Sequence, residues 1–116
     1  MNLDKVPSTL EDAIDMIIAD LTEDDLDYLE NNKSTTIHFS YGRYIRNIWS
    51  LWDSETVLVQ HFLNRFDIAH ADDISGIILE CVWRKVNSVA LDIESQVKKY
   101  HEHWTKLGLP RNGIQK

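Results

Sequence analysis

The sequence predicts an all-α protein, a single compact domain of about five helices with a long C-terminal helix. Two observations lead to this prediction. The 116 residues include four glycines and two prolines, which are too few for the turns of a β-rich chain of this length. Apolar residues also recur at spacings of three and four along most of the chain, as they do on one face of a helix. We expect one domain over residues 1–116, with an ordered core over residues 6–107 and a tail over residues 108–116.

The first predicted helix begins after Pro7. Residues 8–11 have the Ser-x-x-Glu pattern of a capping box, in which the Ser8 hydroxyl accepts a hydrogen bond from the third helical amide and Glu11 reaches back. The apolar stripe of this helix consists of Leu10, Ile14, Ile17 and Leu21.

The second predicted helix begins with Thr22 as its N-cap. Three acidic residues at positions 23–25 fill its first turn, where the helix dipole favours anions. Leu26 and Leu29 form a short apolar face, and residues 31–34 form the following loop.

The third predicted helix covers residues 34–52, where large side chains recur at helical spacing. Its stripe consists of Ile37, Tyr41, Tyr44, Ile45, Ile48 and Trp52. Gly42 weakens a helix by about 1 kcal/mol relative to alanine, so we expect close packing against another helix at that point.

Residues 53–55 are predicted to end the third helix and to cap the fourth, which is about ten residues long. Its inner face comprises Val57, Leu58, His61 and Phe62, with Arg65 at the margin. Residues 66–70 read as a connector.

The last predicted helical segment covers residues 72–107. Its first part has a broad stripe formed by Ile74, Ile77, Ile78, Cys81 and Val82. Its second part has the narrow seam of a helix that lies along another helix, formed by Val86, Val89, Ile93, Val97, Tyr100, Trp104 and Leu107. The segment is either one continuous helix or two helices that meet at a bend near residues 87–88. Gly108 and Pro110 end it, and residues 111–116 are expected to be loose.

The charge of the chain is unevenly distributed. The formal net charge is −7, yet residues 1–32 hold ten acids and one base, while residues 33–116 hold nine acids and eleven bases. This balance disfavours nucleic acid and anionic membranes as partners. Helix N-termini explain only part of the acidic cluster, so the rest is either a solvated face or a surface for a basic partner. The candidate partner-binding residues are Asp20, Glu23, Asp24, Asp27 and Glu30.

No residue pattern indicates catalysis, and we expect no enzyme activity, no cofactor and no metal. His101 and His103 lie two residues apart, on different faces of a helix, and the acidic cluster lacks the glycine bend of a calcium loop. Cys81 lies in an apolar stripe and is expected to be buried and inert. A single cysteine and the absence of a long apolar run favour a location in the cytoplasm, away from the membrane.

The tryptophans and one arginine are assigned structural roles. Trp49, Trp52 and Trp83 are expected in the core. Arg46 lies inside an apolar segment, and a buried arginine requires a carboxylate partner. The candidates are Asp72 and Asp73, with a ligand-facing role for Arg46 as the alternative.

Four stretches of the chain resemble a family of small bacterial proteins catalogued as a domain of unknown function. They are Pro7 to Ala13 (P-S-T-L-E-D-A), His38 to Trp52 (H-F-x-x-G-x-x-I-R-N-x-x-x-L-W), His70 to Ile78 (H-x-D-D-x-S-x-x-I) and Asp92 to Trp104 (D-I-E-x-Q-V-x-x-Y-x-x-x-W). The resemblance spans about residues 6–107 and implies a bacterial, cytosolic, helical domain. It also suggests an immunity protein of a contact-dependent inhibition system or a related toxin system.

Three functions are compatible with these features. The first is an immunity protein that binds and neutralises a cognate toxin domain, a basic nuclease, through the acidic face. The second is a non-catalytic adaptor or regulatory domain that forms a homodimer through the seam of residues 86–107. The third is a metal-assisted enzyme that uses the acids and histidines.

Overall fold

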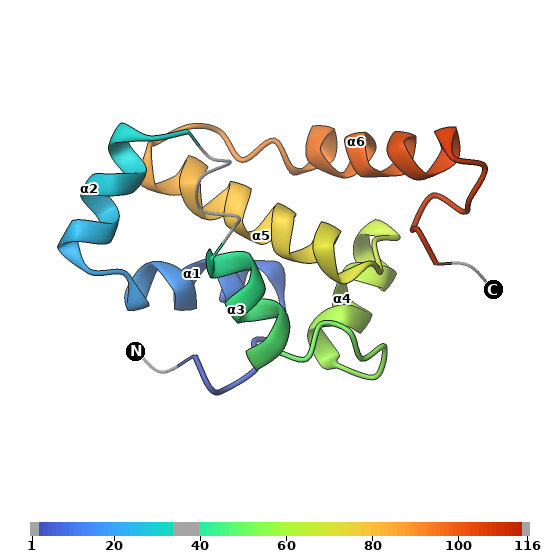
Figure 1. Ribbon diagram of the computed structural model, residues 1–116, viewed down its shortest axis with the longest axis horizontal. Helices are drawn as coiled ribbons and strands as arrows, with labels where there is room; N and C mark the ends of the chain where they lie inside the picture. The colour runs from blue at the N-terminus through green and yellow to red at the C-terminus, as the bar shows by residue number, and fades with distance from the viewer. Residues whose placement is uncertain (1–2, 34–39, 115–116) are drawn as a thin grey trace.

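A central helix organises the fold. The computed structural model describes residues 3–33 and 40–114, and this part of the chain contains helices and no strand, which confirms the all-α prediction. The helices are α1 (Leu10–Asp20), α2 (Glu23–Asn31), α3 (Ser40–Ile48), α4 (Val57–Phe66), α5 (Ala71–Val86) and α6 (Ile93–Lys106). Each of the other helices packs against α5 (Figure 1). None of the helices described has both the length and the apolar character needed to cross a bilayer.

The N-cap of the first helix lies one residue later than predicted. Thr9, in an extended conformation, is the N-cap, and its hydroxyl accepts a hydrogen bond of 3.1 Å from the amide of Asp12. The predicted capping box is therefore wrong, because Glu11 pairs with Arg65 on α4 at 2.7 Å instead of reaching back. The predicted apolar stripe is confirmed, since Leu10, Ile14 and Ile17 are buried and Leu21 is half-buried.

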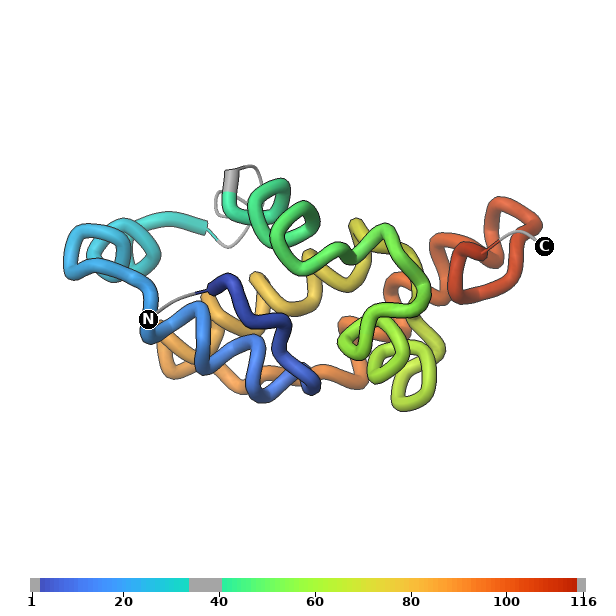
Figure 2. Tube along the Cα trace, turned by 90° about the horizontal axis from the view of Figure 1, so that it is seen from below, coloured from blue at the N-terminus to red at the C-terminus, as the bar shows by residue number. Residues whose placement is uncertain are grey.

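The second helix has the predicted start. The Thr22 hydroxyl accepts a hydrogen bond from the amide of Asp25 at 3.1 Å, and the Asp25 carboxylate accepts one from the amide of Thr22 at 2.9 Å. Leu29 is buried and Leu26 is half-buried, as its apolar face requires. Figure 2 shows α2 at the end of the molecule opposite the C-terminal tail.

The third helix ends earlier than predicted. Ser50 has a left-handed backbone with φ of 51°, and the chain turns there after α3 ends at Ile48. Trp49 enters the core and donates an indole hydrogen bond of 2.8 Å to the carbonyl of Leu3. Trp52 follows the turn and is 62% exposed, so its predicted place in the core is wrong. The predicted Ile37 and the start of the segment at Ser34 lie outside the described residues.

Gly42 confirms the predicted close packing. It is buried where α3 meets α5, and a Cβ there would lie 3.6 Å from Leu79 on α5 and 2.9 Å from the guanidinium of Arg46. The fourth helix has the predicted ten residues. Its N-cap is Thr56, whereas the prediction placed the cap within residues 53–55.

Of the two alternatives left open for residues 72–107, the structure shows the second, because the helix is interrupted after Val86 and resumes at Ile93. The connection between α5 and α6 contains two residues with a left-handed backbone, Ser88 with φ of 57° and Asp92 with φ of 46°. These residues interrupt the helix and turn the chain. Helix α6 then runs back along α5 (Figure 1). The helix that the predicted seam lies along is therefore α5 of the same chain, and Val97 and Tyr100 pack against the core.

The C-terminal tail is held in place up to residue 114. Asp67, the left-handed residue that ends α4, accepts hydrogen bonds from Arg111 at 2.5 Å and from Asn112 at 3.1 Å. Gly113 lies against the indole of Trp104. The predicted looseness is therefore wrong for residues 111–114, because two side chains and a glycine contact anchor them.

Candidate functional site

The five predicted partner-binding acids lie in and just before α2, at one end of the molecule (Figure 1). We call these residues, together with the capping residue Asp25, the acidic end; its members are Asp20, Glu23, Asp24, Asp25, Asp27 and Glu30. The segment of residues 20–32 contains no lysine or arginine. The side chains of Glu23, Asp24, Asp27 and Glu30 are exposed, and within the described part of the chain they form no hydrogen bond or ion pair.

Several carboxylates elsewhere on the surface have cationic partners. Four ion pairs illustrate this, namely Glu11 with Arg65 at 2.7 Å, Asp15 with Lys85 at 2.9 Å, Asp67 with Arg111 at 2.5 Å and Glu80 with Arg84 at 2.7 Å. The negative charge of the chain is thus least compensated at the acidic end, where it remains available to an external cation.

Tyr41 connects the acidic end to α3. Its hydroxyl donates a hydrogen bond of 2.8 Å to the carboxylate of Asp20, the last residue of α1. Burial raises the pKa of the Tyr41 phenol well above its usual range, and the charges of Asp20 and Asp25 raise it further. The hydroxyl therefore stays protonated, and the bond keeps α3 beside the carboxylates.

Two exposed tyrosines accompany these acids. The ring of Tyr44 stands edge-to-face to that of Tyr41 at 6.1 Å and is 49% exposed. Tyr28 on α2 is 52% exposed and lies one helical turn after Asp24. The sequence prediction placed Tyr44 in an apolar stripe. The sequence did contain a signal against this placement. Gly42, Ile45 and Trp49 have the spacing of one buried helix face, and Tyr44 does not share that spacing.

The predicted partners of Arg46 separate in the structure. The guanidinium of Arg46 lies 3.4 Å from the carboxylate of Asp72 and donates a hydrogen bond of 2.9 Å to Ser75. Asp73 is not part of this contact, because successive helical residues point about 100° apart. It is buried against α6 and accepts a hydrogen bond of 2.7 Å from the indole of Trp104.

The four histidines in the described part of the chain hydrogen-bond to or pack against other groups of the fold. His61 accepts a hydrogen bond from the amide of Leu10, and His70 caps α5 by accepting from the amide of Asp72, both at 3.1 Å. His101 lies 3.0 Å from the carbonyl of Asp67, while the ring of His103 stands against Trp104. Among the residues that the structure describes, no three His, Cys, Asp or Glu side chains form a group that could hold a metal ion.

Trp83 and Cys81 were both predicted to be buried, and the structure buries only Cys81 completely. Trp83 is half-buried and donates an indole hydrogen bond of 2.8 Å to the carbonyl of Asn32. Cys81 is fully buried, and burial raises the pKa of its thiol to about 11. A thiol with that pKa stays protonated at neutral pH and is a poor nucleophile.

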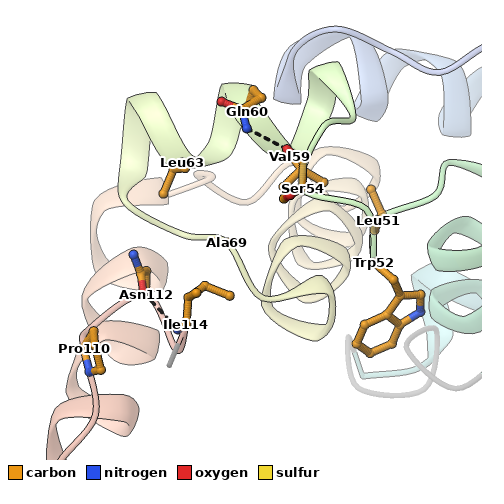
Figure 3. A pocket seen from close by; sticks show the side chains of 10 residues that line it. All are labelled: Leu51, Trp52, Ser54, Val59, Gln60, Leu63, Ala69, Pro110, Asn112 and Ile114. Atoms are coloured by element: carbon orange, nitrogen blue, oxygen red, sulfur yellow. Dashed lines mark hydrogen bonds between the residues drawn. The ribbon is translucent and has the colours of Figure 1, made fainter. Parts of the chain in front are cut away.

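A hollow of about 560 Å³ lies at the other end of the molecule, between α4, the turn before it and the C-terminal tail (Figure 3). Its lining is mostly apolar and includes Leu51, Val59, Leu63 and Ile114. Its amide side chains are engaged within the chain, since Gln60 donates to the carbonyl of Ser54 at 2.6 Å and Asn112 accepts from the amide of Ile114 at 2.9 Å (Figure 3).

The family described as Domain of unknown function (DUF6794) matches residues 6–86. Because this match covers well over half of the chain, the chain belongs to that family. The match includes α1 to α5 and the whole acidic end, and it stops at the last residue of α5. It is therefore shorter than the resemblance over residues 6–107, and α6 lies outside it. No curated protein and no solved structure matches the chain.

Proposed function

We propose that this member of the family is a non-catalytic inhibitor that binds a basic protein partner through the acidic end. The partner that best fits this chemistry is a cognate bacterial toxin domain with nuclease activity, which makes the chain an immunity protein of the bacterial cytoplasm. The observation that carries the proposal is the set of exposed carboxylates on α2, which have no cationic partner in the described part of the chain.

The mechanism follows from charge complementarity. A nuclease holds the phosphates of its substrate with lysine and arginine side chains, so its cleft is positively charged. A helix that presents Glu23, Asp27 and Glu30 along one side offers carboxylates in place of those phosphates. Opposite charge also speeds encounter and sets the orientation of the complex.

Affinity requires more than charge, because exposed ion pairs contribute little in water. Tyr28 and Tyr44 are large exposed aromatic side chains near the carboxylates, and tyrosine is one of the residue types that most often dominate binding energy. We infer that these rings are the anchors of the interface and that the surrounding carboxylates select the partner.

The test compares two double variants with equal change of charge. The partner assayed is the product of the neighbouring reading frame, and its affinity is measured by calorimetry at low and at high salt. Asp24→Asn/Asp27→Asn alters the acidic end, whereas Glu55→Gln/Glu102→Gln alters exposed acids on the turn before α4 and on α6. The expected result is a loss of affinity of about tenfold for the first variant at low salt and a much smaller loss for the second. Equal losses in both variants, or binding indifferent to salt, would contradict the proposal.

The alternative is a regulatory domain that dimerises through the seam of residues 86–107. Most of that seam packs against α5 of the same chain, and its large apolar members left exposed are Val89 and Leu107. Sedimentation of Val89→Asp and Leu107→Asp variants tests it, because these positions are free of the core. A dimer that dissociates in these variants favours the alternative, and a monomeric wild-type chain excludes it.

A further inference from the structure

A hollow of about 360 Å³ lies between the first turn of α5 and the second half of α6, at the opposite end of the molecule from α2. Its walls include the carboxyl group of Asp73, the phenol of Tyr100 and the rings of His70, His103 and Trp104. None of these side chains belongs to the acidic end. The volume lies within the range of small-molecule sites, and the lining combines aromatic rings with a few polar groups.

Asp73 is a buried carboxyl group with an incomplete set of hydrogen bonds. The residue is 5% exposed, and its Oδ2 accepts the indole hydrogen bond of Trp104 at 2.7 Å. Its Oδ1 has no hydrogen-bond partner among the described residues. Burial raises the pKa of this carboxyl group, and the hydrogen bond from Trp104 acts in the opposite direction. A buried carboxylate with one donor is poorly stabilised, so this position favours a cation or a further donor.

Tyr100 provides a second unused polar atom in the same hollow. Its hydroxyl lies over Gly76, one turn after Asp73 on α5, where the lack of a Cβ leaves room for the oxygen. The hydroxyl forms no hydrogen bond in the described part of the chain. Burial, and then the charge of Asp73, raise the pKa of this phenol to about 12, so the oxygen remains a neutral hydroxyl that can accept a hydrogen bond.

Aromatic rings enclose the space around these two oxygens. The ring centroids of His70 and Trp104 are 5.3 Å apart with an interplanar angle of 32°, and the ring of His103 stands 4.9 Å from Trp104. Aromatic rings next to a carboxylate stabilise an ammonium group, and they do not hinder the alkyl chain attached to it. Lys99 also lines the hollow, and as an exposed cation it would oppose such a ligand.

We propose that this hollow binds an alkylammonium group, whose N–H donors reach Oδ1 of Asp73 and the hydroxyl oxygen of Tyr100. The group is either that of a free small amine or that of a lysine side chain on a partner. The site is independent of the acidic end, so either proposal can fail without the other.

The test follows the indole N–H of Trp104 by nuclear magnetic resonance, because this proton bonds to Asp73. The resonance is assigned by its loss in Trp104→Phe. Wild-type protein is titrated with n-butylammonium chloride, with n-butanol and sodium chloride as controls, and in a second arm with N-acetyl-lysine amide. We expect saturable shifts with a Kd of about 1 mM for at least one ammonium ligand. Because a lysine side chain carries the same butylammonium group, tighter binding of the lysine derivative than of n-butylammonium assigns the site to a partner side chain, and tighter binding of n-butylammonium indicates a free ligand.

Three variants make the result specific. Asp73→Asn keeps an acceptor for Trp104 but removes the charge, and it should weaken binding at least tenfold. Tyr100→Phe should weaken it less, and Lys99→Ala should strengthen it by removing a competing cation. The proposal is overturned if neither ammonium ligand saturates, if n-butanol gives the same shifts, or if Asp73→Asn binds as wild type. Where Asp73→Asn does not fold, an unchanged affinity in both of the other variants overturns it.

Discussion

Gly76 of α5 lies directly beneath the hydroxyl of Tyr100 from α6. A Cβ at position 76 would overlap the Tyr100 oxygen and would lie 3.4 Å from the ring carbon that carries it. No other residue type leaves this space free, so the glycine determines how closely α6 approaches the central helix. The contact also holds the Tyr100 hydroxyl in its place beside Asp73.

Gly76→Ala should therefore destabilise the protein, although alanine is the better helix former. We expect a loss of roughly 1–3 kcal/mol in the free energy of unfolding, measured by urea denaturation, because the phenol must move. The same substitution in a Tyr100→Phe background should cost less, since the clashing oxygen is gone. Gly42→Ala is the matched control, because its Cβ would meet Arg46 and Leu79 rather than Tyr100, so its cost should be the same in both backgrounds. Equal costs of Gly76→Ala in both backgrounds would show that the hydroxyl does not set the helix spacing.

His61 provides a pH-dependent contribution to stability. Its Nε2 accepts the amide hydrogen bond of Leu10 at 3.1 Å, which requires a neutral ring, and burial lowers the pKa of the imidazole. As the pH falls, the unfolded chain therefore takes up this proton first. The stabilisation is complete above the ordinary histidine pKa and is lost as the pH falls through the lowered value.

His61→Phe tests this contribution. The variant keeps an aromatic ring against Phe62 and Phe66 but removes the acceptor, so it should lose about 1 kcal/mol of unfolding free energy at mildly alkaline pH. The difference from wild type should shrink in mildly acidic buffer, where the wild-type ring becomes charged. Urea denaturation at both pH values measures it, and a difference independent of pH would contradict the assignment.

Hydrophobic spacing predicted the buried faces of this fold well, because burial on one side of a helix leaves a period in the sequence. It predicted helix ends poorly. Ser8 and Thr9 are both good N-caps, and only the contact of Glu11 with α4 distinguishes them. Trp52 has the spacing of the α3 stripe. It does not lie on that helix face, because the left-handed backbone at Ser50 turns the chain before Trp52.

The acidic end was predictable since its members fall within eleven consecutive positions, residues 20–30. The contacts that shape both candidate sites were not, because they join distant parts of the chain. Tyr41 reaches Asp20 across 21 positions, and Trp104 reaches Asp73 across 31. No local pattern in the sequence predicts such pairs, which arise from the packing of α3 and α6 against the rest of the fold.

Two tryptophans three positions apart should differ sharply in their contributions to stability. Trp49 is fully buried and hydrogen-bonded to Leu3, whereas Trp52 is mostly exposed. Trp49→Ala is expected to lose about 3–5 kcal/mol of unfolding free energy, and Trp52→Ala less than about 1 kcal/mol. Where Trp49→Ala does not fold, Trp49→Phe replaces it, because phenylalanine retains most of the packing. The urea midpoint of Trp49→Phe should still be lower than that of Trp52→Ala. The reverse order would place Trp52 in the core.

The bond between Tyr41 and Asp20 should stabilise the fold and hold α3 against the acidic end. Tyr41→Phe removes one partner of a half-buried, charge-assisted bond and should lower the unfolding free energy by about 1–2 kcal/mol. Asp20→Asn alters the other partner, and the double variant should lose less than the sum of the two single variants. Because the pKa of Tyr41 is raised in the folded chain, this stabilisation is present at neutral pH and declines as the pH rises past the ordinary phenol value. Urea denaturation of the four proteins at neutral and alkaline pH measures both effects. Strictly additive losses would mean that the two side chains are not coupled.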